Sequence, residues 1–323
     1  MSDAANESFA FGSELMGRGY ATHLDYVVGG ITLAASIVAV LLGFYNLYLV
    51  KTITIFHNAF GAFWASRTVG EIGSNAVYVL YSGPMTLLQP KWVHPYAGIL
   101  IFTIGYFFAC HACVMHQVVS ANRMIAVCLP LKYRLIFSKR VCQILIAMCW
   151  IEVAFVVLLY LVVPCQMVGP ITARFSTTGM ERDFSYVGTV VNRFCFCVCF
   201  ATVITDLITL VKIVQIKKSG KQTSTFRRDV RFFFQTSVQN ITMMMALTMI
   251  VVANNSQSPD SMITQILGFD TLIITHINNA LALIIFNPEV RARIAGKSTN
   301  SIGADSGPRQ VPPRSTDHSS HEI

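Results

Sequence analysis

The chain has 323 residues, of which 54% are hydrophobic and only 12% are charged, and its formal net charge is +8. Soluble domains carry about 25% charged residues, so this composition argues against an ordinary soluble domain and suits a chain that meets lipid. The basic residues form short clusters between apolar runs instead of one continuous basic face, which argues against nucleic-acid binding.

The first 26 residues, 1–26, are acidic and lack the basic start and apolar core of a cleavable signal peptide. We therefore expect an extracellular N-terminal segment that crosses the membrane behind the first spanning helix. Its triplet Asn6-Glu7-Ser8 is a sequon, so Asn6 is the candidate glycosylation site.

A helix needs about 20 mostly apolar residues to cross the hydrocarbon layer. Seven segments meet this requirement, and they predict an all-α fold with one transmembrane domain over 27–286. The predicted spans are 27–50, 54–82, 96–121, 141–163, 186–213, 231–253 and 263–286.

The Lys and Arg residues of the connections concentrate on one side of the predicted spans, as between Arg123 and Arg140 and between Lys217 and Arg228. Because cytoplasmic connections carry the excess of Lys and Arg, this bias predicts a multi-pass protein with its N-terminus outside and its C-terminus inside.

Two segments follow the last span. Residues 287–297 fit an amphipathic helix on the membrane surface, in contact with lipids. Residues 298–323 are rich in Ser, Thr and Pro and are predicted to be a disordered cytoplasmic tail. The tail is either only solvated or a target of kinases that recruits arrestin through the added charge.

Charged residues inside the predicted spans require partners. Arg67, Glu71 and Asn75 share one helix face, and a charge at mid-bilayer costs about 2.5–3.5 kcal/mol. We expect this face to point into the bundle, either as a structural ion pair or as a polar switch. Arg193 and Asp270 either pair across the bundle or contact a ligand.

The third span contains Cys110, Cys113 and His116 on one helix face, with His111 off that face. Tetrahedral zinc needs four ligands, or three and a water, so we interpret these as packing residues and expect no metal or other cofactor. Cys also occupies alternate positions over 195–199, and these three thiols cannot all share one helix face.

The segment from Asn122 to Leu131 resembles the Asp-Arg-Tyr region of rhodopsin-like G-protein-coupled receptors, because Arg123, Ala126 and Pro130 keep its spacing. Asn46 late in the first span and Asn278-Asn279 near the inner end of the seventh agree with this resemblance. It implies a seven-transmembrane helix bundle of the G-protein-coupled receptor type.

A closer resemblance is to the nematode serpentine chemoreceptors of class x, and it covers residues 30–295. It rests on the stretches Asn58 to Gly61, Asn122 to Tyr133, and Phe286 to Arg291. It implies a chemosensory receptor that lies in the plasma membrane, with the sensory cilium as one possible location. Such a receptor binds an extracellular small molecule or peptide and activates a heterotrimeric G protein.

The resemblance also implies roles for individual residues. The residues expected to couple to the G protein are Asn122, Arg123, Pro130, Asn278 and Asn279. The expected intramembrane polar network is Asn46, Arg67, Glu71 and Asn75. The candidates for the ligand site, among the outer halves of spans 3, 5, 6 and 7, are Tyr106, Cys110, Arg193, Met244 and Asp270. Arg123 would be a latch on the fifth to seventh spans; the alternative is that it only reaches lipid headgroups.

The chain departs from its relatives at several positions. Asn122 replaces the acidic neighbour of the arginine, which implies a looser resting latch and higher basal signalling. Gly98 stands where most relatives have a cysteine, so Cys165 lacks its expected partner. Gly105 stands where amine receptors hold a carboxylate, so an amine bound in that way is not expected.

The sequence also bears on three other functions. A retinal-based light sensor needs a lysine in the seventh span, and 263–286 has none. The sequence has no paired catalytic acids, HExxH motif or phosphate-binding loop, so no enzyme is indicated. A seven-helix transporter or channel is the alternative, although repeated halves and mid-membrane helix-breaking Gly/Pro pairs are missing.

Overall fold

The computed structural model describes residues 17–162, 186–220, 224–255 and 261–296. Asn6, Cys165 and the predicted tail therefore lie outside the described residues. The helices are α1 (His23–Thr52), η2 (Thr54–Phe56), α2 (Ala59–Val77), η3 (Tyr78–Ser82), α3 (Gly83–Leu88), α4 (Pro95–Cys128), α5 (Tyr133–Ile136), α6 (Lys139–Val162), α7 (Tyr186–Lys218), α8 (Ser224–Asn255), α9 (Ser261–Phe286) and α10 (Pro288–Ile294).

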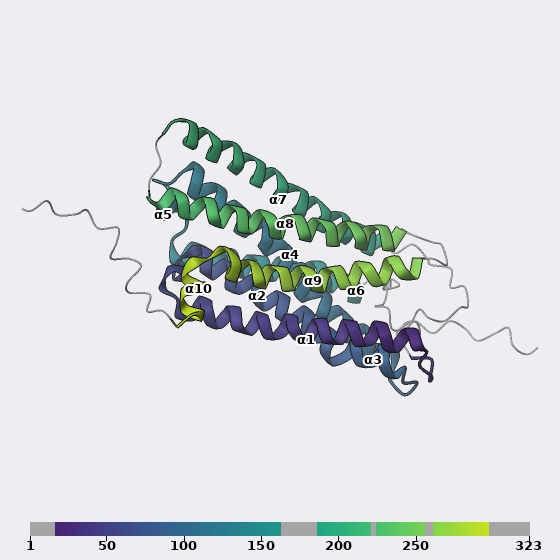
Figure 1. Cartoon of the computed structure of the whole chain (residues 1–323). Helices are drawn as coiled ribbons and strands as arrows, with labels where there is room; N and C mark the ends of the chain where they lie inside the picture. Colours follow the sequence, from purple (N-terminus) through teal and green to yellow (C-terminus); the bar gives the residue numbers. More distant parts are fainter. Residues whose placement is uncertain (1–16, 163–185, 221–223, 256–260, 297–323) are drawn as a thin grey trace, which may run out of the picture.

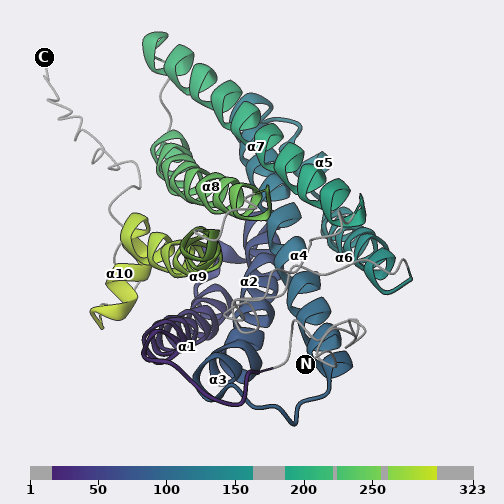
Figure 2. The ribbon, with the colours of Figure 1, turned by 90° about the vertical axis from the view of Figure 1, so that its right-hand side faces the viewer.

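The long helices run side by side in one bundle (Figure 1). The short helices α5 and α10 lie at one end of the bundle, which we call the inner end, and α3 lies at the other, outer end. In Figure 2, α4 lies near the middle of the bundle, and it contacts α2, α6, α7 and α8. The third predicted span is thus the one that most other helices pack against.

All seven predicted spans coincide with helices, but the start of the second was wrong. Residues Thr54–Phe56 form a separate short turn, and α2 begins at Ala59. The side chain of Asn58 caps α2 by accepting a hydrogen bond from the backbone nitrogen of Gly61 at 3.1 Å. Gly61 itself is required by close approach, because a Cβ there would lie 1.8 Å from the carbonyl oxygen of Phe56.

The outer end is fixed by the segment before α1. Thr22 and Asp25 form a capping box at the start of α1, and Arg18 forms an ion pair with Asp25. The backbone nitrogen of Gly19 donates to the carbonyl oxygen of Gln89 at 2.7 Å, at the end of α3. The chain ahead of the first span is therefore tied to the first outer connection.

The outward faces of the helices carry large apolar side chains, including Leu41, Leu80 and Phe155. Four helices in the described residues are long and apolar enough to cross a membrane, or five if α9 and α10, bent by 88°, count as one span. Two of the remaining long helices, α2 and α8, carry many buried polar residues, which lower their apolar character while their polar side faces inward.

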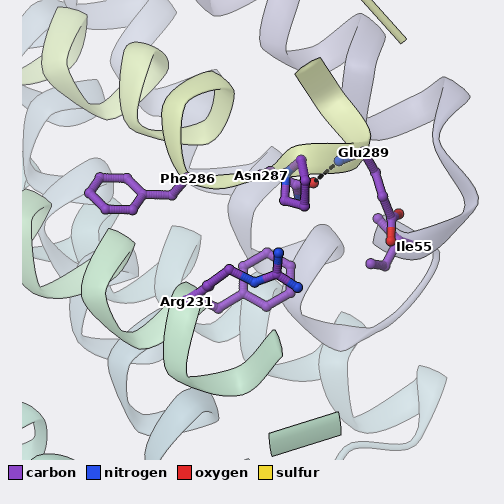
Figure 3. Close-up of a pocket in the computed structure, with 7 residues that line it drawn as sticks. Ile55, Arg231, Phe286, Asn287 and Glu289 are labelled. Carbon is purple, nitrogen blue, oxygen red and sulfur yellow. Dashed lines mark hydrogen bonds between the residues drawn. The ribbon is translucent and has the colours of Figure 1, made fainter. Parts of the chain in front are cut away.

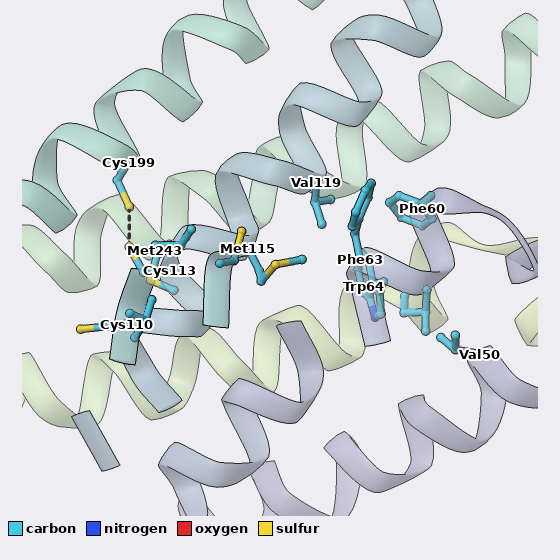
Figure 4. Packing of buried hydrophobic residues seen from close by; sticks show 14 of the residues in the cluster. Val50, Phe60, Phe63, Trp64, Cys110, Cys113, Met115, Val119, Cys199 and Met243 are labelled. Atoms are coloured by element: carbon cyan, nitrogen blue, oxygen red, sulfur yellow. Dashed lines mark hydrogen bonds between the residues drawn. The ribbon is translucent and has the colours of Figure 1, made fainter. Parts of the chain in front are cut away.

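Buried apolar side chains fill much of the bundle interior. Phe60, Phe63 and Trp64 of α2 pack with Met115 of α4 and Met243 of α8 (Figure 4).

Candidate functional site at the inner end of the bundle

Arg123 lies at the inner end of α4 and is only 6% exposed. Its guanidinium carbon lies 3.3 Å from the ring centroid of Phe60 on α2 and 4.2 Å from that of Phe232 on α8. Cation–π contacts of this kind contribute up to about 2 kcal/mol when they are desolvated. Arg123 is therefore held inside the protein by two aromatic rings and does not extend to the lipid headgroups.

Asn122, the residue before Arg123, is fully buried, and its side chain is hydrogen bonded to α5. Its side-chain oxygen accepts a hydrogen bond from the hydroxyl of Tyr133 on α5 at 3.0 Å. The Tyr133 ring packs on Phe137, with centroids 5.3 Å apart, and Phe137 packs edge-on against Phe63 of α2. Asn122 thus ties the connection after α4 back onto the bundle, and exposed Pro130 lies within that connection.

A small, open hollow lies at the inner end of the bundle, on the side where Phe232 contacts Arg123 (Figure 3). It is lined by side chains from η2, α8, α9 and α10, which are Ile55, Arg231, Phe232, Phe286, Asn287, Pro288 and Glu289. Asn287 caps α10, because its side-chain oxygen accepts from the backbone nitrogens of Glu289 and Val290. Phe232 lines the hollow and also contacts Arg123. A shift of α8 would therefore change both the width of the hollow and the contact with Arg123.

A polar cluster fills the middle of the bundle around the predicted face of α2. The Nε of Arg67 lies 3.2 Å from Oε1 of Glu71, and both side chains are buried. The Nη1 of Arg67 donates to the side-chain oxygen of Gln239 on α8 at 3.3 Å. Asn279 on α9 donates to Oε1 of Glu71 at 2.6 Å, and Asn75 donates to His276 on the same helix at 2.7 Å. The ion pair therefore faces the interior and joins α2 to α8 and α9.

The cluster continues toward α7 through the third span. Asn279 also donates to Nε2 of His116 at 3.3 Å, and Nδ1 of His116 donates to Asn240 on α8 at 3.1 Å. Asn240 in turn donates to Asp206 on α7 at 2.8 Å, and Ser120 of α4 donates to the same carboxylate at 2.6 Å. One hydrogen-bonded network thus connects five of the long helices.

Some partners in this network were not predicted from the sequence. Gln239, Asn240 and His276 carry much of the network, and the available signal was their spacing as single polar residues inside apolar spans. Asn279, a predicted coupling residue, belongs to this network, and its neighbour Asn278 donates to Thr242 at 3.1 Å. Asn46 is buried on α1, but in the described part of the chain it makes no hydrogen bond to the network.

The five candidates for the ligand site do not form one group. Cys110 is buried, and Tyr106 and Met244 pack against the same core. Arg193 is exposed on α7, and Asp270 accepts a hydrogen bond from Thr32 of α1 at 2.8 Å. Among the described residues, Arg193 and Asp270 form no ion pair, so the structure does not support the alternative in which they pair across the bundle.

The histidines of the third span have separate surroundings. His111 stacks on Trp150 with centroids 3.4 Å apart and is hydrogen bonded to Ser66 at 3.0 Å, whereas His116 belongs to the polar network. Within the described ranges, no three His, Cys, Asp or Glu side chains are placed to hold a metal ion. Cys195 and Cys199 are buried, while Cys197 between them is exposed, as their alternation predicted.

An all-helical bundle with an arginine buried at the inner end of its central helix is the architecture of a G-protein-coupled receptor. The family of serpentine type seven-transmembrane G-protein-coupled chemoreceptors Srx matches residues 34–287. The chain therefore belongs to the Srx chemoreceptors, and the prediction from the sequence is confirmed at the level of family and fold. This family consists of receptors and not of enzymes. No curated protein matches the chain.

Proposed function

We propose that this receptor binds an extracellular ligand and activates a heterotrimeric G protein through the inner end of the bundle. The observation that carries this proposal is the position of Arg123. It is the buried cation that joins α4 to α2 and to α8 through Phe60 and Phe232. A contact between three helices is sensitive to any movement of one of them.

The activating step would be a movement of α8 away from α4. A ligand can drive it only by binding the active arrangement more tightly than the resting one. The movement would take the Phe232 ring away from Arg123 and widen the hollow that the same ring lines. The α subunit of the G protein would then bind in the widened space, beside the released guanidinium.

The polar network would couple the outer and inner halves of the bundle. Charged and amide groups buried in a bundle have few ways to satisfy their hydrogen bonds, so helices tend to move between discrete arrangements. Asn279 contacts Glu71 and His116 together, so a rotation of α9 would break contacts to α2 and α4 at once.

The orientation and surroundings of the receptor are part of this proposal. The N-terminus would be extracellular, with glycan on Asn6, and residues 298–323 would be a cytoplasmic tail for kinases and arrestin. Helix α10 would lie on lipid at the inner surface, because Arg291, Arg293 and Ile294 are exposed while Val290 is buried. The location would be the plasma membrane, including the sensory cilium.

The test is a chemical screen in cells that express the full chain with a G-protein dissociation sensor. Arg123→Ala is compared with Arg140→Ala, since Arg140 is an exposed arginine near the same inner end. Staining of an N-terminal tag on intact cells equalises surface amounts and reports the orientation. We expect Arg123→Ala to abolish the response and Arg140→Ala to retain it. A response that survives Arg123→Ala would contradict the proposed role, and ligand-gated ion flux in liposomes would favour a channel.

A further inference from the structure

Helices α4 and α7 meet along a regular series of side-chain contacts. From the inner half outward, Ser120 contacts Thr205 at 2.8 Å, and Gln117 accepts a hydrogen bond from Thr202 at 2.6 Å. Both helices advance by three or four residues from one contact to the next, so they run parallel in fixed register. The outer half of this seam carries sulfur in place of oxygen and nitrogen.

Two pairs of thiols continue the seam toward the outer end. The Sγ atoms of Cys113 and Cys199 lie 3.4 Å apart, and those of Cys110 and Cys195 lie 4.0 Å apart. All four side chains are buried. Figure 4 shows Cys113 and Cys199 pointing toward each other. In the described chain these groups hold no metal-site geometry, so the chemistry available to them is that of neighbouring thiols.

We propose that Cys113 and Cys199 form a modification site for neutral hydroperoxides, which convert the pair into a disulfide that links α4 to α7. Two features of the seam support this site. The two sulfur atoms already touch, and a disulfide bond of about 2.0 Å needs only a further approach of the side chains. The two helices that carry these thiols are held together by the contacts at Gln117 and Ser120. Cys199 therefore lies close enough to attack a sulfenic acid formed on Cys113, and Cys113 one formed on Cys199.

The reaction balances in two steps. The sulfur of the first thiol attacks one peroxide oxygen and the O–O bond breaks; the thiol becomes a sulfenic acid, and the departing oxygen takes the thiol proton and leaves as water or an alcohol. The second thiol then attacks the sulfenic sulfur, forms the S–S bond and releases water. In total, two thiols and one hydroperoxide give one disulfide, one water and one further water or alcohol.

The surroundings select the class of oxidant. These thiols are buried in an apolar core, so charged thiol reagents dissolved in water do not reach them. A small uncharged peroxide can partition into the bundle and reach them. The proposal concerns this covalent chemistry alone and stands or falls independently of G-protein coupling.

The experiment uses the full chain in lipid nanodiscs and hydrogen peroxide as the probe. After treatment the protein is denatured, its free thiols are labelled with a polyethylene-glycol maleimide, and its peptides are mapped by mass spectrometry. We expect two fewer labelled thiols than in untreated protein, a Cys113–Cys199 linked peptide, and full recovery of both thiols with a reducing agent.

Matched variants decide the assignment. Cys199→Ser should abolish the paired loss, whereas Cys197→Ser should leave it unchanged, because Cys197 lies two residues away and faces outward. Near-identical melting temperatures for the two variants would show that both are folded. If Cys199→Ser misfolds, the peptide map of the unaltered protein still decides. Unchanged labelling after peroxide, a paired loss that persists in Cys199→Ser, or a linked peptide between other cysteines would overturn the proposal.

Discussion

The contact between Arg123 and Phe232 leads to the sharpest prediction. Replacing Phe232 with leucine keeps an apolar side chain at this point of α8 but removes the aromatic face that lies 4.2 Å from the guanidinium carbon. The Phe60 ring at 3.3 Å remains, so Arg123 loses only its contact to α8, while the Phe232 ring contacts with Phe56 and Phe60 are lost as well. The substitution therefore weakens the resting arrangement without removing the arginine.

The size of the effect follows from the energy of the contact. A desolvated cation–π contact contributes about 1–2 kcal/mol, and each 1.4 kcal/mol is a factor of ten in an equilibrium. Phe232→Leu should thus raise the ratio of active to resting receptor about 5-fold to 30-fold. Because the resting ratio is small, this appears as a rise in basal signalling without ligand.

The assay is ligand-free G-protein dissociation, divided by the amount of receptor at the cell surface. Phe234→Leu is the matched control, because Phe234 lies two residues away on the same helix and is exposed. Phe232→Tyr keeps the ring and should keep basal signalling near that of the unaltered receptor. If basal signalling of Phe232→Leu equals that of Phe234→Leu at equal surface amounts, the aromatic latch does not hold the resting state.

Other substitutions test the remaining contacts. Asn122→Asp should lower basal signalling in the same assay, because a carboxylate beside the arginine favours the resting arrangement; an unchanged basal level would count against a loosened latch. Glu71→Gln leaves the buried cation of Arg67 without its counter-charge and should lower the free energy of unfolding by about 3–5 kcal/mol. The measurement is the Tm of purified receptor, which should fall. Glu152 is exposed, so Glu152→Gln should leave the Tm unchanged. Gly61→Ala should reduce the amount of folded receptor at the cell surface, because the new Cβ would lie 1.8 Å from the last carbonyl oxygen of η2. Gly30→Ala is the control, since its Cβ meets nothing within 4 Å. Equal surface amounts of the two variants would refute the need for glycine at position 61.

The parts of the fold that depend on one helix at a time were readable from the sequence. A membrane-spanning segment must satisfy its own backbone hydrogen bonds, so a long apolar run commits to a helix. The same reasoning placed Arg67 and Glu71 on one face, since residues four apart on a helix are neighbours. It also separated exposed Cys197 from its buried neighbours.

Contacts between helices were only partly predictable. The family resemblance pointed to Arg123 as a contact with the later spans, but not to Phe60 and Phe232 as the rings that hold it. It also assigned Asn279 to the coupling residues, but it did not indicate that α9, packed between α1 and α8, brings this side chain within a hydrogen bond of Glu71 on α2. Single polar residues in apolar helices indicate that partners exist, but not which ones.

By itself, the sequence determined the number of spans, the helical fold, the family and the residues that need a buried partner, because these follow from local apolar length, spacing and motif. Only the tertiary structure decided the partners themselves. The rotation and register of neighbouring helices brought Arg123 onto Phe232 and Cys113 onto Cys199. Both depend on side-chain packing over the whole bundle, and residues far apart in the chain set it together.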